Sequence, residues 1–437
     1  MTTRTARSLQ GTITVPGDKS ISHRAIIMAA LAEGKSRLQG FLRGEDTLNT
    51  ANIFSALGIS ITGLEKPGDI TVHGRGLHGL REAADILYTG NSGTTTRLLA
   101  GLLSAQPFFS ILSGDRSINQ RPMGRVITPL RQMGAAIWGR QDDSLPPLAI
   151  KGKQLHAICH SSPVASAQVK SCLMLAGLYV DDQLTINEPV LSRDHTERMF
   201  RAFGIKVSTT TGKTSPATIC MTPPAANFPG TDFIIPGDIS AAAFFLVAAL
   251  INRHSSLKIT NVGINPTRSG IIQVLQSMGG AIAVENQREA CGEPVADLIV
   301  EGSNQLKGVE ISGTLIPSLI DEIPILALAA AHAEGVTVIR DAQELRVKES
   351  DRLQAITLLL QVMGVKTEPL PDGIVIHGGI QAPTKEPLSF TTFGDHRIAM
   401  TAMVAGTTLE NKITIDHPEC IGTSFPGFAQ LLSNSCQ

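Results

Sequence analysis

Two glycine-containing segments of the sequence place cations and hydroxyl groups at the start of an expected helix. Residues 17–24 read GDKSISHR and residues 90–97 read GNSGTTTR. A tight turn, hydroxyls and free backbone N–H groups at a helix N-terminus are the components of a phosphate or oxyanion site. The first segment is not a Walker A loop, because G-x-x-x-x-G-K is absent. In the second, Gly93 would let a ligand approach the backbone closely.

Two further segments add guanidinium groups and a carboxylate. Arg121 precedes a proline that holds the chain extended, so it could grip a carboxylate or phosphate with two hydrogen bonds; a lone surface arginine is the commoner alternative. In residues 345–352, LRVKESDR, a continuous helix would place Lys348 and Arg352 on one face, with Glu349 about 100° around it. Taken alone, this charge cluster is typical of a solvated helix start.

Repeated elements must position these segments. One phrase, an amphipathic helix that ends in glycine and is followed by a strand, occurs five times at a spacing of roughly seventy to eighty-five residues. The five copies read IFSALGISI, PLRQMGAAI, MFRAFGIKV, VLQSMGGAIAV and LLLQVMGVKT. We interpret SFPGFAQLL near the C-terminus as a sixth, truncated copy. The sequence therefore predicts a six-fold α/β architecture.

A second type of helix, rich in small apolar residues, precedes each copy of the phrase. The six segments read HRAIIMAALAEG, TTTRLLAGLLSA, AQVKSCLMLAGL, SAAAFFLVAALI, DEIPILALAAAHAEG and DHRIAMTAMVAG. Because they are apolar on nearly every side, we expect them to be buried. Each follows a polar turn, so six helix N-termini could gather anions. For any single turn, ordinary helix capping explains the same residues equally well.

Composition limits the class of protein. A chain of 437 residues with 42% hydrophobic content predicts two domains. A net charge of -1 and only 4% aromatic residues argue against nucleic-acid and anionic-membrane partners. Six scattered cysteines without a CxxC pair indicate neither a zinc site nor a disulfide framework. No apolar run is long enough to span a membrane or follows the N-terminal arginines, so we expect a cytoplasmic protein.

Nine motifs together resemble one family. They are PGDKSISHR, GNSGTTTR, NQRPMGRV, SAQVKS, LSRDH, IDEIP, ELRVKESDR, GDHRIAM and TSFPGF. In this order, from about Gly11 to about Phe428, they are similar to the 5-enolpyruvylshikimate-3-phosphate synthases, the shikimate-pathway enzymes inhibited by glyphosate. Any one motif is weak, but nine in order over nearly the whole chain are highly specific.

The resemblance implies a two-lobed enolpyruvyl transferase fold. Each lobe would contain three βαβαββ units, with the N-termini of the buried helices facing the cleft between the lobes. Residues 1–17 and 238–437 would form lobe one, and residues 18–237 lobe two. The implied reaction moves the enolpyruvyl (carboxyvinyl) group of phosphoenolpyruvate to the 5-hydroxyl of shikimate 3-phosphate and releases phosphate. The family also implies a monomer, no metal and no cofactor.

The resemblance assigns residues to both substrates, which are polyanions and therefore need a cation-lined site. Shikimate 3-phosphate is expected to contact Lys19, Ser20, Arg24, Ser166, Ala167, Gln168, Arg193, Asp321 and Lys348. Phosphoenolpyruvate is expected to contact Lys19, Gly93, Arg121, Gln168, Glu349, Arg352 and Arg397. Two assignments have local alternatives: Ser20 as a helix N-cap, and Arg193 in a plain ion pair with Asp194.

Three residues are expected to take part in the chemistry. Asp321 matches the carboxylate that contacts the 5-hydroxyl and ranks first as the general base. Glu349 and Lys19 are candidates for proton transfer at C3 of phosphoenolpyruvate and for stabilising developing charge. Which residue protonates C3 does not follow from the sequence.

Several positions indicate the branch of the family called class II. Glu344 stands where the other branch has an asparagine, Glu322 follows Asp321 directly, and Thr423 stands in place of a lysine. We therefore leave Thr423 out of the site. Gly93 is small enough to admit glyphosate, which makes the compound a plausible inhibitor.

Two alternatives to the synthase remain. A UDP-N-acetylglucosamine enolpyruvyl transferase of the same fold would begin with a GAKN motif and carry a reactive cysteine in a mobile loop. The corresponding segments here read GDKS and SGDRSINQRPMG, without cysteine. A non-catalytic polyanion binder would have no need of Asp321 and Glu349 beside its anions. The residues present favour the synthase over both.

Overall fold

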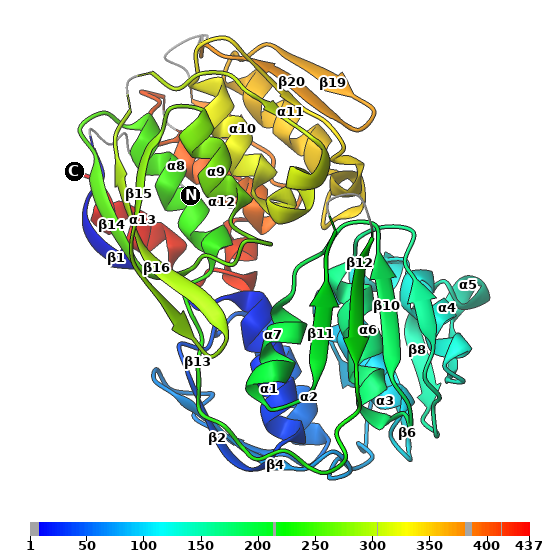
Figure 1. Ribbon diagram of the computed structural model, residues 1–437. Coiled ribbons are helices and arrows are strands. Elements are labelled where there is room, and N and C mark those ends of the chain that lie inside the picture. Colours follow the sequence, from blue (N-terminus) through cyan, green and yellow to red (C-terminus); the bar gives the residue numbers. More distant parts are fainter. Residues whose placement is uncertain (1–7, 213–215, 304, 381–386, 412) are drawn as a thin grey trace. The chain divides into compact units, whose positions relative to one another are not determined.

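The chain divides into two compact units, each with its own hydrophobic core (Figure 1). The computed structural model describes residues 8–212, 216–303, 305–380, 387–411 and 413–437; the N-terminal segment 1–7, used above for the targeting prediction, lies outside them. Unit 1 contains Met1–Pro16, Pro236–Glu289 and Pro294–Gln437, and unit 2 contains Gly17–Ile235 and Ala290–Glu293.

The segment Ala290–Glu293 groups with unit 2, whereas the predicted lobe one runs without a break from 238 to 437. The reason lies in its contacts: the Glu293 carboxylate lies 2.8 Å from Nδ1 of His195, and the Cys291 sulfur accepts the Ile234 N–H at 3.4 Å. Both partners belong to unit 2.

The strands of unit 2 form three four-stranded sheets that share one pattern of pairing. In each sheet the first two strands are parallel and the remaining pairs are antiparallel. In spatial order the sheets are β13 (Phe233–Ile234), β2 (Glu33–Gln39), β4 (Ile70–Arg75) and β3 (Ser60–Thr62); β5 (Leu87–Tyr88), β6 (Phe109–Ser113), β8 (Leu145–Lys151) and β7 (Ala136–Gly139); and β9 (Cys159–Ser161), β10 (Leu184–Glu188), β12 (Ala217–Met221) and β11 (Val207–Thr210).

The described strands of unit 1 form two four-stranded sheets and one two-stranded sheet. Each again begins with a parallel pair, which is followed by an antiparallel one in the larger sheets. The sheets are β1 (Gln10–Thr14), β14 (Ser256–Gly263), β16 (Glu293–Glu301) and β15 (Ala281–Ala290); β17 (Glu310–Ile311), β18 (Val336–Ile339), β20 (Gly373–His377) and β19 (Thr367–Leu370); and β21 (Leu388–Phe390) with β22 (Ile413–Ile415).

Two strands are exchanged between sheets where the chain passes from one unit to the other. β1 directly precedes the first helix of unit 2 in sequence, yet it pairs with β14 of unit 1. β13 precedes the first helix of unit 1, yet it pairs with β2 of unit 2. At the first passage, a Cβ atom on Gly17 would lie 1.9 Å from the Gly40 carbonyl oxygen, so this turn requires glycine.

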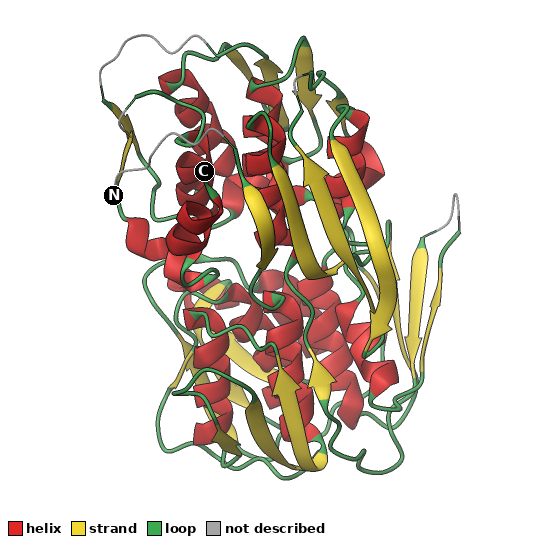
Figure 2. Cartoon of the chain, turned by 90° about the vertical axis from the view of Figure 1, so that its left-hand side faces the viewer, coloured by secondary structure: helices red, strands yellow, loops and turns green. Residues whose placement is uncertain are grey.

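The six predicted apolar helices are present and almost completely buried, and they pack against the faces of the sheets (Figure 2). They are α1 (Lys19–Leu31), α3 (Gly93–Ser104), α6 (Ala167–Ala176), α8 (Ile239–Ile251), α10 (Ile323–Ala331) and α12 (His396–Ala405). Five are capped by a side chain that accepts a first-turn N–H, namely Asp18, Ser92, Ser166, Asp238 and Asp395. Capping therefore uses part of the hydrogen-bonding capacity that the sequence predicted for anions.

The glycine-terminated helices follow the predicted repeat. They are α2 (Glu45–Ala56), α4 (Gly124–Gln132), α7 (His195–Ala202), α9 (Gly270–Ser277) and α11 (Arg352–Val362). The glycine after each has φ between 74° and 95°, the left-handed conformation that ends a helix. The sixth copy was predicted wrongly: Gly427 precedes α13 (Phe428–Ser435) as its N-cap instead of ending a helix.

The remaining helical segments are short. They are α5 (Arg140–Asp143) and the 3₁₀ turns η1 (Ile118–Gln120), η2 (Gly177–Tyr179), η3 (Gly313–Ser318), η4 (Ile320–Glu322), η5 (Gln343–Val347) and η6 (Pro418–Thr423). Within the described part of the chain, no helix has both the length and the apolar character that crossing a bilayer would require.

Candidate active site

In unit 1, three carboxylates surround one buried guanidinium. The side chain of Arg352, the first residue of α11, is only 1% exposed. Its Nε lies 2.8 Å from Asp395 Oδ2, its Nη1 lies 3.1 Å from Asp321 Oδ1, and its Nη2 lies 2.6 Å from Glu349 Oε2. Asp395 is fully buried, whereas Asp321 is 14% exposed and Glu349 25% exposed. The two outer carboxylates can therefore reach a ligand while the inner one holds the arginine.

In this cluster, neighbouring charges shift the pKa values of Arg352 and Asp395 more than burial does. Burial alone would lower the pKa of Arg352, but Asp395, Glu349 and Asp321 together raise it above its ordinary value. Burial would raise the pKa of Asp395, yet the Arg352 guanidinium keeps it below the ordinary range. Both groups are therefore ionised at neutral pH, and the cluster is a fixed arrangement of charges.

The segment before α11 differs from its prediction. The turn η5 ends at Val347, and α11 begins only at Arg352, because Asp351 caps the helix by accepting the Gln354 N–H at 3.1 Å. An N-cap residue has non-helical backbone angles, so Lys348 and Glu349 lie outside the helix and the predicted shared face is wrong. The two residues still join the cluster: Lys348 Nζ lies 3.6 Å from Asp321 Oδ1.

Arg397, in the first turn of α12, is fixed by backbone and carboxylate together. Its Nη1 donates to the Asp321 carbonyl oxygen at 3.0 Å and lies 3.5 Å from Glu322 Oε1. The buried Glu322 also accepts a hydrogen bond from Ser240, at the start of α8, and Ser240 in turn accepts one from Arg268 at 2.7 Å. This network joins the N-terminal turns of α8, α10 and α12.

In unit 2, the hydrogen bonds that Arg24 donates end on neutral oxygens. Its Nε donates to Thr196 Oγ1 at 2.7 Å, its Nη2 to Ser171 Oγ at 2.7 Å and its Nη1 to the Ser20 carbonyl at 2.9 Å. Burial lowers the pKa of Arg24 to about 10, and the nearby charge of Arg193 contributes in the same direction. An anion placed here would relieve that cost, because opposite charge favours the charged form.

Of the other residues predicted for unit 2, Lys19, Gly93 and Gln168 lie at the starts of α1, α3 and α6. Lys19 Nζ lies 3.1 Å from Asp46 Oδ2. Gln168, beside Ala167 in the first turn of α6, accepts from Arg97 Nη1 at 2.6 Å and donates to Thr94 Oγ1 at 3.2 Å. The side chains of Gln168 and Arg97 thereby connect α6 to α3.

Gly93 lies among guanidinium groups. A Cβ atom at this position would be 2.8 Å from Arg97 Nη1 and 3.4 Å from Arg121 Nη1. Arg121 has extended backbone, as its proline neighbour predicts, and its Nη2 donates to Asn91 Oδ1 at 2.5 Å. The absence of a side chain at Gly93 thus lets the Arg97 guanidinium approach the backbone.

The sequence left a local alternative for Ser20, as a helix N-cap, and for Arg193, in an ion pair with Asp194. The side chain that caps α1 is Asp18, which accepts the Ile21 N–H at 2.8 Å, and Ser20 contributes its carbonyl to Arg24. Asp194 forms an ion pair with Arg198 at 2.8 Å. Capping by Ser20 is therefore not what the structure shows, and the carboxylate of Asp194 is engaged along its own helix.

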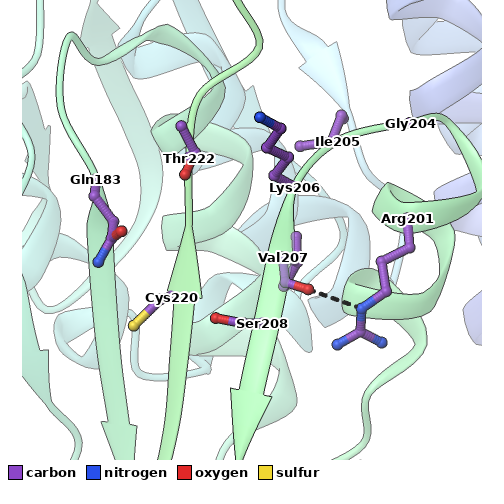
Figure 3. A pocket seen from close by; sticks show the side chains of 9 residues that line it. All are labelled: Gln183, Arg201, Gly204, Ile205, Lys206, Val207, Ser208, Cys220 and Thr222. Carbon is purple, nitrogen blue, oxygen red and sulfur yellow. Dashed lines mark hydrogen bonds between the residues drawn. The ribbon is translucent and has the colours of Figure 1, made fainter.

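One hollow in unit 2 is lined by none of these site residues. It has a volume of about 420 Å³ and is formed by the end of α7 and strands β11 and β12, with Arg201, Lys206, Ser208 and Cys220 among its lining (Figure 3). Arg201 Nε donates to the Val207 carbonyl at 2.9 Å, as the dashed line in Figure 3 shows.

The Arg201 contact belongs to the repeat. Arg131 of α4 donates to the Ile137 carbonyl at 2.7 Å, and Gln276 of α9 to the Ile282 carbonyl at 2.9 Å, each six residues further along the chain. Three copies of the phrase thus use the same bond to close the connection from helix to strand. The hollow is a consequence of this connection, and we do not assign it a ligand.

Comparison with solved structures defines the class of fold. The EPSP synthase of Acinetobacter baumannii, 45% identical, superimposes with a TM-score of 0.87 over 100% of this chain and 97% of that chain. The enolpyruvyl transferase NikO of Streptomyces tendae, 18% identical, gives a TM-score of 0.78 over 99% of this chain and 96% of its own. The second likeness concerns the fold alone. The fold is therefore the α/β enolpyruvyl transferase fold, built here from six small mixed or parallel sheets.

Sequence comparison identifies the family. Residues 3–432 match the family model for EPSP synthase (3-phosphoshikimate 1-carboxyvinyltransferase). The chain is 50% identical to the 3-phosphoshikimate 1-carboxyvinyltransferase of Geotalea daltonii, over 99% of this chain and 98% of the relative. It is 51% identical to that of Citrifermentans bemidjiense, over 100% and 99%. The chain belongs to the EPSP synthase family.

The activity follows from this membership. It is that of a 3-phosphoshikimate 1-carboxyvinyltransferase, EC 2.5.1.19, in the shikimate pathway of aromatic amino acid biosynthesis. The family implies shikimate 3-phosphate and phosphoenolpyruvate as substrates. The predicted family and activity are confirmed, and the two alternatives, the nucleotide-sugar transferase and the non-catalytic binder, are set aside.

Several residues of the two clusters were missed by the sequence-based predictions. Asp395 immediately precedes the motif residues His396 and Arg397, but its role as the buried partner of Arg352 depends on a contact 43 residues away. Arg97 stands at the end of the GNSGTTTR motif and could have been found there. The bond between Ser240 and Glu322 joins residues 82 positions apart, and the sequence carried no signal for it.

Proposed function

We propose that both units contribute to one active site, which binds the two substrates in a cleft between the units. In this proposal the fold consists of six βαβαββ repeats, three in each unit, and the N-termini of the buried helices face the cleft. The positions of the site residues support it: Lys19, Gly93 and Ala167 are the first residues of α1, α3 and α6, and Arg397 is the second of α12. Asp321 lies in the turn that leads into α10.

Unit 2 is assigned mainly to shikimate 3-phosphate. Arg24, Ser20, Ser166, Ala167, Gln168 and Arg193 would surround it, with Lys19 between the two substrates. Arg24 supports this role, because its hydrogen bonds end on neutral oxygens and leave its charge uncompensated by them. A phosphate that approaches such a guanidinium gains charge-assisted hydrogen bonds without displacing a carboxylate.

Phosphoenolpyruvate is assigned to arginines of both units. Gly93, Arg121 and Gln168 would meet it from unit 2, and Glu349, Arg352 and Arg397 from unit 1. In this proposal an anionic substrate takes the place of Asp321 or Glu349 on the Arg352 guanidinium, which holds three carboxylates. Binding would therefore release a carboxylate next to the reacting atoms.

The released carboxylate supplies the base for the addition step. The 5-hydroxyl of shikimate 3-phosphate attacks C2 of phosphoenolpyruvate as C3 gains a proton; C3 then loses a proton as phosphate leaves. Asp321 would accept the hydroxyl proton, Glu349 would exchange protons at C3, and Lys19 and Lys348 would stabilise developing negative charge. The observation that carries this assignment is that Asp321 is partly exposed and lies 3.1 Å from Arg352 Nη1 and 3.6 Å from Lys348 Nζ.

Phosphate release tests the proposal. Incubation with shikimate 3-phosphate and phosphoenolpyruvate should release phosphate, whereas UDP-N-acetylglucosamine in place of the first substrate should give none. Glyphosate should compete with phosphoenolpyruvate, because Gly93 leaves room beside Arg97 and Arg121. We further propose that the enzyme acts as a cytoplasmic monomer, and a turnover per chain that is independent of protein concentration would support the monomer. Release only with the nucleotide sugar would overturn the assignment of substrates.

A further inference from the structure

A buried carboxylate at the end of β10 joins two segments that are proposed to bind shikimate 3-phosphate. The Glu188 side chain is 1% exposed. Its Oε1 accepts the backbone N–H of Ser166 at 3.0 Å, and its Oε2 accepts the backbone N–H of Ser192 at 3.1 Å. The Ser192 hydroxyl lies 2.7 and 2.8 Å from the two oxygens. Since Ser166 caps α6 and Ser192 precedes Arg193, one carboxylate fixes the backbone of both segments.

Lys170 supplies the counter-charge. Its fully buried Nζ lies 3.0 Å from Glu188 Oε2, 2.7 Å from Glu197 Oε1 and 3.2 Å from the Ser192 carbonyl oxygen. Burial alone would lower the pKa of Lys170, but the two carboxylates raise it. Glu188 thus accepts hydrogen bonds from two backbone N–H groups, a hydroxyl and an ammonium.

Glu197 connects this network to Arg24. Burial raises the pKa of Glu197, and its charge acts on the neighbouring Arg24 guanidinium. Ser171 follows Lys170 in sequence and Thr196 precedes Glu197, and the hydroxyl oxygens of both accept hydrogen bonds from Arg24. The start of α7 is therefore tied to α6 by Lys170, and both helices are tied to α1 by Arg24.

We propose that Glu188, paired with Lys170, is a positioning residue for shikimate 3-phosphate. It does not touch the substrate. It sets the distance between the N-terminus of α6 and the segment that carries Arg193, so that both meet the same ligand. The inference rests on the proposed assignment of Ser166 and Arg193 to this substrate. Stability alone is a poor reason for the arrangement, because a buried ion pair is seldom better than well-packed apolar residues.

Glu188→Gln tests the proposal with a side chain of the same shape. The amide keeps one oxygen but turns the other into a donor that faces the Ser192 N–H and the Lys170 ammonium. We expect the KM for shikimate 3-phosphate to rise by about 10- to 100-fold, as for loss of a charge-assisted hydrogen bond. The KM for phosphoenolpyruvate and kcat should stay within about threefold.

Leu184→Ala is the matched control for a general weakening of β10. Leu184 is fully buried in the same strand, and its truncation leaves a cavity without touching either segment. It should lower Tm while the KM for shikimate 3-phosphate changes by less than about twofold. Should Glu188→Gln not fold, Ser192→Ala removes the hydroxyl partner alone and should raise the same KM several-fold.

Two results would overturn the inference: an unchanged KM for shikimate 3-phosphate in the folded variant, or an equal rise in both KM values. Arg193→Ala separates this failure from a failure of the proposed site. If Arg193→Ala weakens binding of shikimate 3-phosphate and Glu188→Gln does not, only the positioning role of Glu188 is wrong. If Arg193→Ala has no effect, the assignment of the site itself is wrong.

Discussion

Arg24 of unit 2 and Arg352 of unit 1 are both buried arginines at proposed anion sites, but their surroundings are opposite. The hydrogen bonds of Arg24 end on two hydroxyls and a carbonyl, and burial lowers its pKa to about 10. The hydrogen bonds of Arg352 end on three carboxylates, which raise its pKa. One guanidinium therefore makes its hydrogen bonds to neutral groups, whereas the other makes them to carboxylates.

This difference suggests a division of labour. A guanidinium held by neutral groups suits the capture of a phosphate, because no internal ion pair must be broken. A guanidinium held by carboxylates suits proton chemistry, because an arriving anion displaces a carboxylate that can then act as a base. We therefore expect changes in unit 2 to alter substrate binding and changes around Asp321 to alter turnover.

The largest expected effect is on the unit 1 side. Asp321→Asn should lower kcat by roughly 10²–10⁴ if the residue is the general base, because an amide cannot accept the hydroxyl proton. Steady-state phosphate release measures this. Asp297→Asn is the control: Asp297 is a hydrogen-bonded carboxylate of the same unit, bound to the Asn261 N–H at 3.0 Å, and its loss should leave kcat unchanged. Near-normal turnover in Asp321→Asn would move the base to Glu349.

Replacing each arginine by methionine compares the two surroundings directly. Arg352→Met leaves Asp395 buried without its main partner and should cost about 3–5 kcal/mol of unfolding free energy. Arg24→Met leaves neutral hydrogen-bond partners, among them the Ser171 and Thr196 hydroxyls, which already lie 2.6 Å apart, and removes a charge that Glu197 favours, so its cost should be smaller than that of Arg352→Met. Denaturant unfolding of both variants measures this. Equal losses of stability in the two variants would contradict the inferred difference between the surroundings of Arg24 and Arg352.

Gly93→Ala tests whether the space beside Arg97 and Arg121 binds phosphoenolpyruvate. The added methyl group would lie 2.8 Å from Arg97 Nη1 and must push it aside, so the KM for phosphoenolpyruvate should rise by about tenfold. Gly124→Ala is a matched control at the first residue of α4, where a Cβ atom meets nothing within 4 Å. A normal KM in Gly93→Ala would remove this residue from the site.

The smallest effect concerns pH and two buried carboxylates. Arg352 lowers the folded-state pKa of Asp395. The Asp395 carboxylate therefore contributes fully to the unfolding free energy above the ordinary pKa of 3.8, and this contribution is lost as pH falls through the folded pKa. The pKa of Glu197 is raised by burial, so stability is lost as pH rises from 4.5 through its folded pKa. Relative to the wild type, the unfolding free energy of Asp395→Asn should rise as pH falls below 3.8. That of Glu197→Gln should rise as pH rises above 4.5.

Each of these pH-dependent changes should be on the order of 1 kcal/mol. Unfolding free energies measured across the two pH ranges check them. The same direction of change in both variants would contradict the opposite electrostatic surroundings inferred for the two units.

The repeat was the most predictable part of the fold, because its signal is local. The five glycines that end helices occupy the left-handed conformation for which the sequence selected them, and the apolar helices are buried as their composition requires. The sixth copy failed because Gly427 can start a helix as well as end one. The exchange of β1 and β13 could not be predicted, since periodicity does not say which sheet a strand joins.

The site was predictable only in part. The motifs placed Asp321, Arg352 and Arg397 in the sequence, and these residues do lie together in unit 1. The helix expected across Lys348 and Glu349 failed because the capping preference of Asp351 outweighed the i, i+4 charge pattern. Contacts between distant carboxylates and cations carry no periodic signal, so the partners of Arg352 and the network around Glu188 emerged only from the structure.

Calorimetric titration of shikimate 3-phosphate into the wild type, Arg24→Met and Asp321→Asn tests the division of labour most directly. Asp321→Asn should bind with a Kd within about threefold of the wild type, because its amide can still hydrogen-bond the 5-hydroxyl. Arg24→Met should bind at least about tenfold more weakly, because a charge-assisted hydrogen bond is lost. Normal binding by Arg24→Met together with loss of binding by Asp321→Asn would contradict the account.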